Sequence, residues 1–181
     1  MKQYEEALNA LKRLKEGNKI YVNSKNAVGD ISPERRIETY KNGQKPYAVI
    51  ISCADSRVIP ESIFSAGIGD LFVIRVAGNI VDNSQLGSIE YAVEHLGCKL
   101  VLVLGHTGCG AVGAAGGNCG GFVKFITDEI RKAIGGETDA VKASILNTQA
   151  SVAKIREKLT SQNITVAGAL YHTDSGTVDF F

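Results

Sequence analysis

Four short runs of consecutive apolar residues recur along the chain and predict buried β-strands. The runs are rich in β-branched side chains and lack the apolar–polar alternation of a strand that has one face in water. Continuous apolar strands are typical of a parallel sheet, which is covered on both faces. The runs span residues 47–52, 71–76, 99–104 and 164–170.

Helical patterns separate these runs. At the N-terminus, Tyr4, Leu8 and Leu11 follow three- and four-residue spacing and predict an amphipathic helix that ends near Gly17, with an apolar face that needs a partner. Alternation of strands and helices is the signature of an α/β domain with right-handed crossovers. The other predicted helices span residues 34–40, 60–64, 84–96, 121–133 and 139–159.

The C-terminal residues predict a turn at 174–176 followed by a short antiparallel edge strand at 177–180. We therefore expect a single domain over residues 1–181 of the α/β class. Its central sheet is mostly parallel and flanked by helices, with the antiparallel strand at one edge. Residues 1–40 form an N-terminal helical arm, and residues 44–181 form the α/β core.

Length, net charge and cysteine content limit the classes of protein to which the chain can belong. The chain has 181 residues, 44% of them hydrophobic, which suits one globular domain, and its formal charge of +1 offers no footprint for nucleic acid. Its apolar runs are all far shorter than the roughly 20 residues of a membrane span, and the charged N-terminus is unlike a signal sequence. We expect a soluble, cytoplasmic protein, in which the four cysteines are ligands, nucleophiles or buried side chains rather than disulfides.

Two predicted strands end in chemically reactive residues. Cys53, Asp55 and Arg57 follow the first strand, and His106 and Cys109 follow the third. Sites in open α/β sheets lie beyond the carboxyl ends of the strands. If these strands are neighbours, two thiolates and one imidazole converge into a tetrahedral zinc set with one position left for water or substrate, which is the arrangement of a catalytic zinc.

Other interpretations of these residues are weaker. Either fragment alone would favour a chance match or a buried cysteine. A phosphate-binding cysteine loop needs Arg six positions after Cys53, where Ile59 stands. A cysteine protease with His106 as its base leaves the second thiol unexplained. Cys98 and Cys119 have no partner at ligand spacing, so we expect small buried or partly buried side chains there.

Asp55 and Arg57 are two residues apart and lie on the same side of an extended backbone. A carboxylate beside a guanidinium stays ionised and is held by charge-assisted hydrogen bonds. The pair is either a loop clamp or a switch. In the second case Asp55, once released from Arg57, becomes a fourth zinc ligand and closes the site.

Taken together, the motifs resemble the β-class carbonic anhydrases, with agreement in order and spacing from about residue 44 to residue 115. The resemblance implies Cys53, His106 and Cys109 as ligands of one Zn2+ per chain, and Asp55 with Arg57 as a gating pair. It also implies reversible hydration of carbon dioxide to bicarbonate and a proton by zinc-bound hydroxide. The motifs are Cys-Ala-Asp-Ser-Arg at 53–57, Val-Ala-Gly-Asn at 76–79, Ser-Ile-Glu-Tyr-Ala at 88–92 and Gly-His-Thr-Gly-Cys-Gly-Ala at 105–111.

The resemblance extends to a subclass and to an assembly. Gln44 matches a substrate-contacting glutamine of the plant-like subclass. Phe72 and Tyr91 match apolar pocket residues that the family supplies from the neighbouring subunit, which implies a homodimer or a dimer-based homotetramer whose N-terminal helix packs on the partner. The subclass with a regulatory bicarbonate site carries Trp where Ile50 stands, and the chain has no Trp. We expect that regulatory site to be absent.

Carbon dioxide needs a small apolar pocket, which the resemblance implies is formed by Phe72, Tyr91, Ala77, Val58 and Gly108, although Ala77 stands where the plant-like subclass has valine. In that pocket the Gln44 amide donates a hydrogen bond to the substrate oxygen as negative charge develops. Two other functions remain open on the same zinc ligands. One is hydrolysis of carbonyl sulfide or carbon disulfide, and the other is zinc binding without catalysis, which would not need Asp55, Arg57 and Gln44.

Overall fold

A five-stranded β-sheet forms the centre of the protein in the computed structural model, which describes residues 2–26 and 28–181. The strand order is β2-β1-β3-β4-β5. The first four strands run parallel and β5 is antiparallel to β4, which confirms the fold class that the apolar runs predict. The strands are β1 (Ala48–Ser52), β2 (Leu71–Arg75), β3 (Leu100–His106), β4 (Thr165–Tyr171) and β5 (Val178–Phe180).

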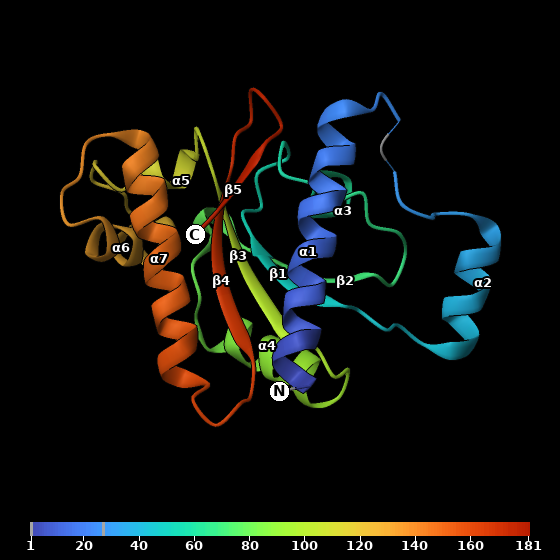
Figure 1. The fold of residues 1–181 in the computed structure, drawn as a ribbon. Helices are drawn as coiled ribbons and strands as arrows, with labels where there is room; N and C mark the ends of the chain where they lie inside the picture. Colours follow the sequence, from blue (N-terminus) through green and yellow to red (C-terminus); the bar gives the residue numbers. More distant parts are fainter. Residues whose placement is uncertain (1, 27) are drawn as a thin grey trace.

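Helices cover both faces of the sheet (Figure 1). Two of the short elements, η1 and α5, have no counterpart among the predicted helices, because their glycines weaken the helical signal. Within residues 2–26 and 28–181, no helix combines the length and the apolar character that crossing a bilayer requires. The helices are α1 (Lys2–Asn23), α2 (Pro33–Asn42), α3 (Pro60–Ile63), the 3-10 turn η1 (Ala77–Asn79), α4 (Asn83–Glu94), α5 (Gly110–Ala114), α6 (Val123–Ile134) and α7 (Ala140–Lys158).

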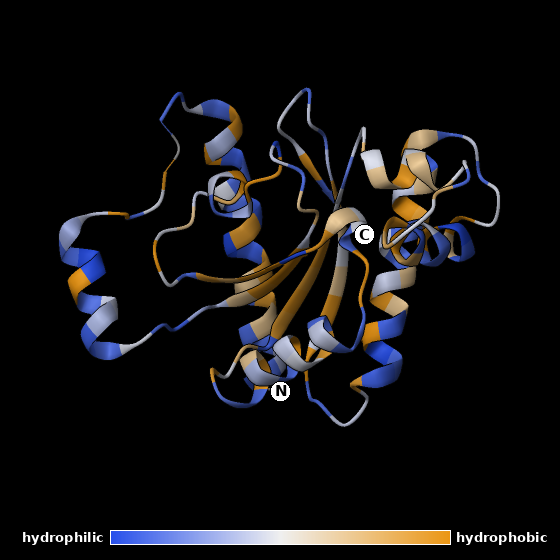
Figure 2. Ribbon diagram, turned by 180° about the vertical axis from the view of Figure 1, so that it is seen from behind, coloured by the Kyte–Doolittle hydropathy of each residue, from blue (hydrophilic) through white to orange (hydrophobic). Residues whose placement is uncertain are grey.

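Strand β1 shows how the core is built on both sides of the sheet. Its side chains alternate between the faces: Ala48 and Ile50 pack with α1 and α3, whereas Val49 and Ile51 pack with α4 and α7. All five residues of β1 are buried, and Figure 2 shows the strands as the most hydrophobic part of the ribbon. This two-sided burial explains why the strands appear in the sequence as continuous apolar runs.

Helix α1 does not end near Gly17, as the sequence suggested, but continues to Asn23. Gly17 is buried where α1 crosses the end of α3, and a Cβ atom at this position would lie 1.9 Å from the carbonyl oxygen of Phe64. Ser65 donates a hydrogen bond to the carbonyl of Gly17 across the same contact, at 2.9 Å. The glycine is therefore needed for close packing and does not terminate the helix.

The N-terminal helices differ in how they contact the rest of the chain. One face of α1 buries Ala7, Ala10 and Leu14 against its own sheet, while Tyr4 and Leu8 stay exposed. Helix α2 projects away from the sheet (Figure 1), and none of its residues is buried against the described part of the chain. Packing of this arm on a partner subunit stays a prediction, and these exposed faces are the surfaces available for it.

Candidate metal centre

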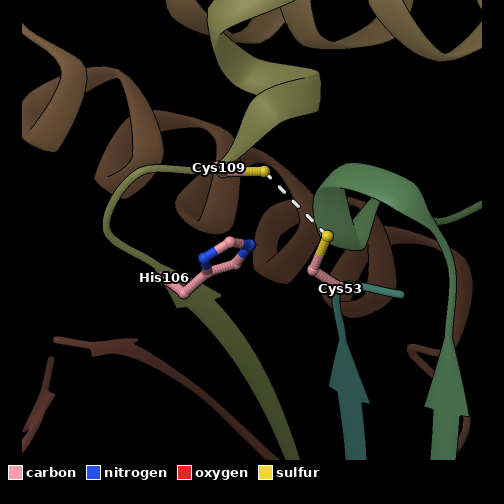
Figure 3. A group of neighbouring side chains, drawn as sticks. All are labelled: Cys53, His106 and Cys109. Atoms are coloured by element: carbon pink, nitrogen blue, oxygen red, sulfur yellow. Dashed lines mark hydrogen bonds between the residues drawn. The ribbon is translucent and has the colours of Figure 1, made fainter. Parts of the chain in front are cut away.

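The metal centre begins with the pairing of β1 and β3, which are neighbours in the sheet. Cys53 directly follows β1, His106 is the last residue of β3, and Cys109 immediately precedes α5. Their two sulfur atoms and an imidazole nitrogen all lie within 4.8 Å of one another, and all three residues are buried. Figure 3 shows the three side chains pointing toward a common centre.

The His106 ring is fully buried and has one nitrogen committed to the backbone. Its Nδ1 lies 3.0 Å from the carbonyl oxygen of Thr107, and because a carbonyl only accepts hydrogen bonds, Nδ1 carries the ring proton. In the neutral ring Nε2 is then the acceptor, and it finds no hydrogen-bond partner among the described residues. A buried, unpartnered imidazole nitrogen whose opposite nitrogen donates to a carbonyl is the arrangement of a metal-ligating histidine.

The two thiols influence each other's charge. Their sulfur atoms are 4.0 Å apart. The contact with Cys109 lowers the pKa of Cys53 below its usual range, against the opposing effect of burial, and His106 and the backbone N–H of Gly78 also lower it. The pKa of Cys109 rises well above its usual range, because the neighbouring Cys53 and burial both oppose a second negative charge. A divalent cation between the sulfurs removes this conflict, since it stabilises both thiolates.

Asp55 and Arg57 form a tight pair at the edge of the cluster. Arg57 Nε donates to Asp55 Oδ1 at 3.0 Å, and Arg57 Nη2 donates to Oδ2 at 2.8 Å and to the carbonyl of Gly108 at 2.9 Å. These bonds hold the pKa of the Asp55 carboxyl well below its usual range. Asp55 Oδ2 is also 3.9 Å from His106 Nε2. The structure thus shows the carboxylate bound to Arg57 and beside the cluster.

The donor set fits zinc. Two sulfurs and one imidazole nitrogen suit this ion, whereas magnesium and calcium prefer oxygen ligands. Three protein ligands leave a fourth position open, as in catalytic zinc sites, and no fourth His, Cys, Asp or Glu joins the cluster within residues 2–26 and 28–181. The unpartnered Nε2 of His106 also favours a bound metal, because burying this nitrogen with neither a hydrogen bond nor a metal ion costs free energy.

Two more elements support the site through residues that the sequence did not single out. Arg75, at the end of β2, donates to the carbonyl of Cys53 at 3.1 Å and to that of Asp55 at 2.7 Å. On α7, the buried Asn147 and Ser151 donate to carbonyls of η1. Two sequence signals point to these supporting residues. One is a charged residue at the end of an apolar strand, and the other is a pair of polar residues four apart on a buried helix face.

Three of the predicted substrate residues do not meet the cluster within one chain. Gln44 is exposed and precedes the start of β1, whereas Cys53 follows its end, so the length of the strand separates them. Phe72 pairs with Val49 in the first half of β1. Its ring lies 6.2 Å from that of Tyr91, centroid to centroid, on α4.

The other predicted pocket residues lie close in sequence to the cluster residues or to Gly78, which contacts Cys53. Val58 is fully buried in the core on the α1 side, and Ala77 begins η1. Gly108 adopts a φ of 67° and presents its carbonyl to Arg57. Gly108 also borders a mostly apolar cavity of about 660 Å³ between α5, α6 and α7, and Phe72, Tyr91, Val58 and Ala77 are not among the residues that line it.

Comparison with known proteins agrees with this geometry. A family model described as carbonic anhydrase matches residues 48–178. Carbonic anhydrase 2 of Mycobacterium tuberculosis is 37% identical, with 92% of this chain and 89% of that protein covered, and the carbonic anhydrase of Mycolicibacterium smegmatis is 36% identical, with 94% and 91% covered. The β-carbonic anhydrase of Coccomyxa, solved in complex with acetazolamide, superposes with a TM-score of 0.69 at 28% identity, covering 81% of this chain and 78% of that one. The chain belongs to the carbonic anhydrase family, and within it to the β class.

Proposed function

We propose that the protein catalyses the reversible hydration of carbon dioxide to bicarbonate and a proton, with one Zn2+ per chain held by Cys53, His106 and Cys109. The observation that carries the proposal is the convergence of two sulfurs and the unpartnered Nε2 of His106 within 4.8 Å, directly beside an ionised Asp55. Membership of the β-carbonic anhydrase family supports the same reaction.

Zinc, when bound, supplies Lewis acidity that lowers the pKa of water from 15.7 toward about 7. The roles of the side chains follow from their contacts. Arg57 keeps Asp55 ionised and fixes its direction. An ionised Asp55 accepts a hydrogen bond from the attacking water and thereby aims the oxygen lone pair at the substrate carbon. Arg57 also ties this carboxylate to the loop of Cys109 through the carbonyl of Gly108.

The same carboxylate suits a second, closed state. Asp55 Oδ2 lies 3.9 Å from His106 Nε2, so a modest rotation away from Arg57 brings it within reach of the position between the three ligands. We propose that Asp55 then acts as the fourth ligand and blocks access of water. Pairing with Arg57 is the state that leaves this position to water and substrate.

We further propose that a second copy of the chain completes the substrate pocket. Gln44, Phe72 and Tyr91 lie away from their own cluster, and Tyr91 is 48% exposed. A homodimer, or a homotetramer built from dimers, would bring them to the partner's cluster, and Ala77 and Gly108 would complete the pocket. Val58 has no exposed surface within one chain and would have to be uncovered to join them. The apolar rings would accommodate carbon dioxide, and the Gln44 amide would donate to its oxygen.

For the cell compartment we propose the cytoplasm. All four cysteines are free thiols in the structure. Thiols persist in reducing compartments, whereas oxidising compartments favour disulfides. The formal charge of +1 offers no footprint for nucleic acid, and the proposed reaction needs no membrane partner.

The test is stopped-flow hydration of carbon dioxide by zinc-quantified protein. Wild type should turn over rapidly, and Cys53→Ala should lose both zinc and activity. Cys119→Ser is the matched control, because Cys119 is a half-buried thiol outside the cluster whose Sγ lies 3.7 Å from the carbonyl of Ala114. Wild type that binds one zinc per chain without hydrating carbon dioxide would contradict the proposed reaction and leave carbonyl sulfide or carbon disulfide as the substrates to assay.

A further inference from the structure

The η1 turn, Ala77–Asn79, supplies a backbone donor to one of the three cluster residues. The N–H of Gly78 lies 3.2 Å from Cys53 Sγ. The turn is conformationally demanding: Gly78 has a φ of 71°, and Asn79, which carries a Cβ, has a φ of 44°. Left-handed backbone of this kind is unfavourable for a residue other than glycine and persists only where the surroundings hold it.

Helix α7 holds this turn through two buried side chains. Asn147 Nδ2 donates to the carbonyl of Gly78 at 2.7 Å, and Ser151 Oγ donates to the carbonyl of Asn79 at 3.0 Å. The two donors are only 2% and 5% exposed. They are four residues apart, so they lie on the same face of the helix and reach two consecutive carbonyls.

The same residue, Gly78, therefore accepts from α7 and donates to the thiol. Its carbonyl is fixed by Asn147 and its N–H points at Cys53 Sγ. A Cβ atom at Gly78 would lie 2.6 Å from Ile130 Cδ1, so the turn is also packed closely against α6. Loss of the Asn147 bond would free the turn to relax from its left-handed conformation, and this would rotate the N–H away from the sulfur.

We propose that Asn147, assisted by Ser151, is a positioning residue of the metal site: it holds the Gly78 N–H on Cys53 Sγ and so orients the thiolate toward the metal. This inference rests on the proposed zinc site. An N–H donor to a thiolate fixes the direction of its lone pairs and withdraws part of its charge, which is the way outer groups tune a metal ligand. Asn147 and Ser151 direct their hydrogen bonds to the η1 carbonyls and not to the cluster residues.

Metal affinity is the measurement that separates positioning from simple burial. Zinc dissociation constants are measured by competition with a chromophoric chelator, and the sulfur-to-metal absorption band is recorded on the cobalt-substituted protein. Asn147→Ala should raise the dissociation constant about 10- to 100-fold and shift the cobalt band. Ser151→Ala should also raise the dissociation constant, by a smaller factor. It removes only one hydroxyl, so it serves as the second test variant if Asn147→Ala folds poorly.

Ser144→Ala is the matched control. Ser144 is a buried serine on the same helix, 2% exposed, but its hydroxyl bonds to the carbonyl of Ala140 within α7. It should lower thermal stability slightly and leave zinc affinity and the cobalt band unchanged. Equal zinc affinities in Asn147→Ala, Ser151→Ala and Ser144→Ala would overturn the inference while leaving the zinc site intact. Failure of wild type to bind zinc or cobalt would overturn the proposed function and this inference together.

Discussion

Arg57 binds both carboxylate oxygens of Asp55, with Nε 3.0 Å from Oδ1 and Nη2 2.8 Å from Oδ2. The backbone N–H of Arg57 adds a third bond to Oδ1 at 2.9 Å. Three donors on one carboxylate fix its orientation as well as its charge. Asp55 is therefore held in place before substrate arrives, beside the only three residues in the described part of the chain that converge as metal ligands.

Removing this carboxylate should impair catalysis more than metal binding. Asp55→Ala should lower kcat/KM for carbon dioxide hydration by about 100- to 10,000-fold, the range that a positioned proton acceptor contributes. Zinc content should stay at one per chain, because the three proposed ligands remain. Stopped-flow assays and metal analysis of the same samples check both parts.

Asp128→Ala is the control for that substitution. Asp128 is also bound by cations, Lys124 and Arg131, but lies on the surface of α6. Its removal should leave the rate within about twofold of wild type, since surface ion pairs contribute little. If Asp55→Ala behaved in the same way, the proposed role of Asp55 would be wrong.

Replacing a helical glycine with alanine should change the free energy of unfolding in opposite directions at two positions. Gly17→Ala should lower the free energy of unfolding by about 1–3 kcal/mol, because its Cβ would overlap the backbone of Phe64, which cannot easily move. Gly87→Ala, on α4, should raise it by about 0.5–1 kcal/mol, because nothing described lies within 4 Å of the added atom and alanine favours helix. Urea unfolding of both variants measures the difference. A stabilised Gly17→Ala would show that α1 does not pack on α3 as described.

The two cysteines outside the cluster should differ in reactivity. Burial raises the pKa of the Cys98 thiol to about 11, and its Sγ donates to the carbonyl of Pro46 at 3.3 Å. Because the thiolate is the reactive form, Cys98 is protonated and unreactive at pH 8, and its reactivity should increase only as the pH approaches 11. Cys119 is partly exposed.

Iodoacetamide labelling followed by peptide mass spectrometry distinguishes the two. Cys119 should be modified first in the native protein at pH 8. Cys98 should be modified only slowly until denaturant is added. Equal native rates would mean that Cys98 is accessible, against its 2% exposure.

Metal removal should lower stability by mass action. At free zinc 100 times the dissociation constant, the folded protein should gain about 2.7 kcal/mol over the chelated protein. The thermal midpoint should therefore rise with zinc concentration. His106→Ala should abolish this dependence, because it removes the nitrogen ligand. A zinc-dependent midpoint as large in His106→Ala as in wild type would contradict the assignment of His106 as a ligand.

The sequence predicts the parallel sheet well, because a strand such as β1 is buried on both faces and appears as an uninterrupted apolar run. The meeting of Cys53 and His106 follows from that sheet, since both lie at carboxyl ends of adjacent strands. The supports of the site were not predictable in this way. Polar residues on a buried helix face mark Asn147 as unusual, but no local pattern identifies Gly78, 69 residues away, as its partner.

The predicted end of α1 was wrong because a glycine can either end a helix or allow close packing within it. Gly17 matches the glycine that commonly ends a helix, yet it lies inside α1. It is glycine because Phe64 leaves no room for a side chain. Only the tertiary contact separates these cases. Likewise, η1 and α5 have only 3 and 5 residues and contain glycine, so no helical pattern marks them in the sequence.

The proposed activity requires one metal ion at Cys53, His106 and Cys109. The most direct measurement is a titration of chelator-stripped protein with zinc while carbon dioxide hydration is followed by stopped flow. Activity should start near zero, rise linearly and level off at one zinc per chain, with no rise in Cys53→Ala. Full activity before zinc is added, or none after one equivalent is bound, would contradict the claim.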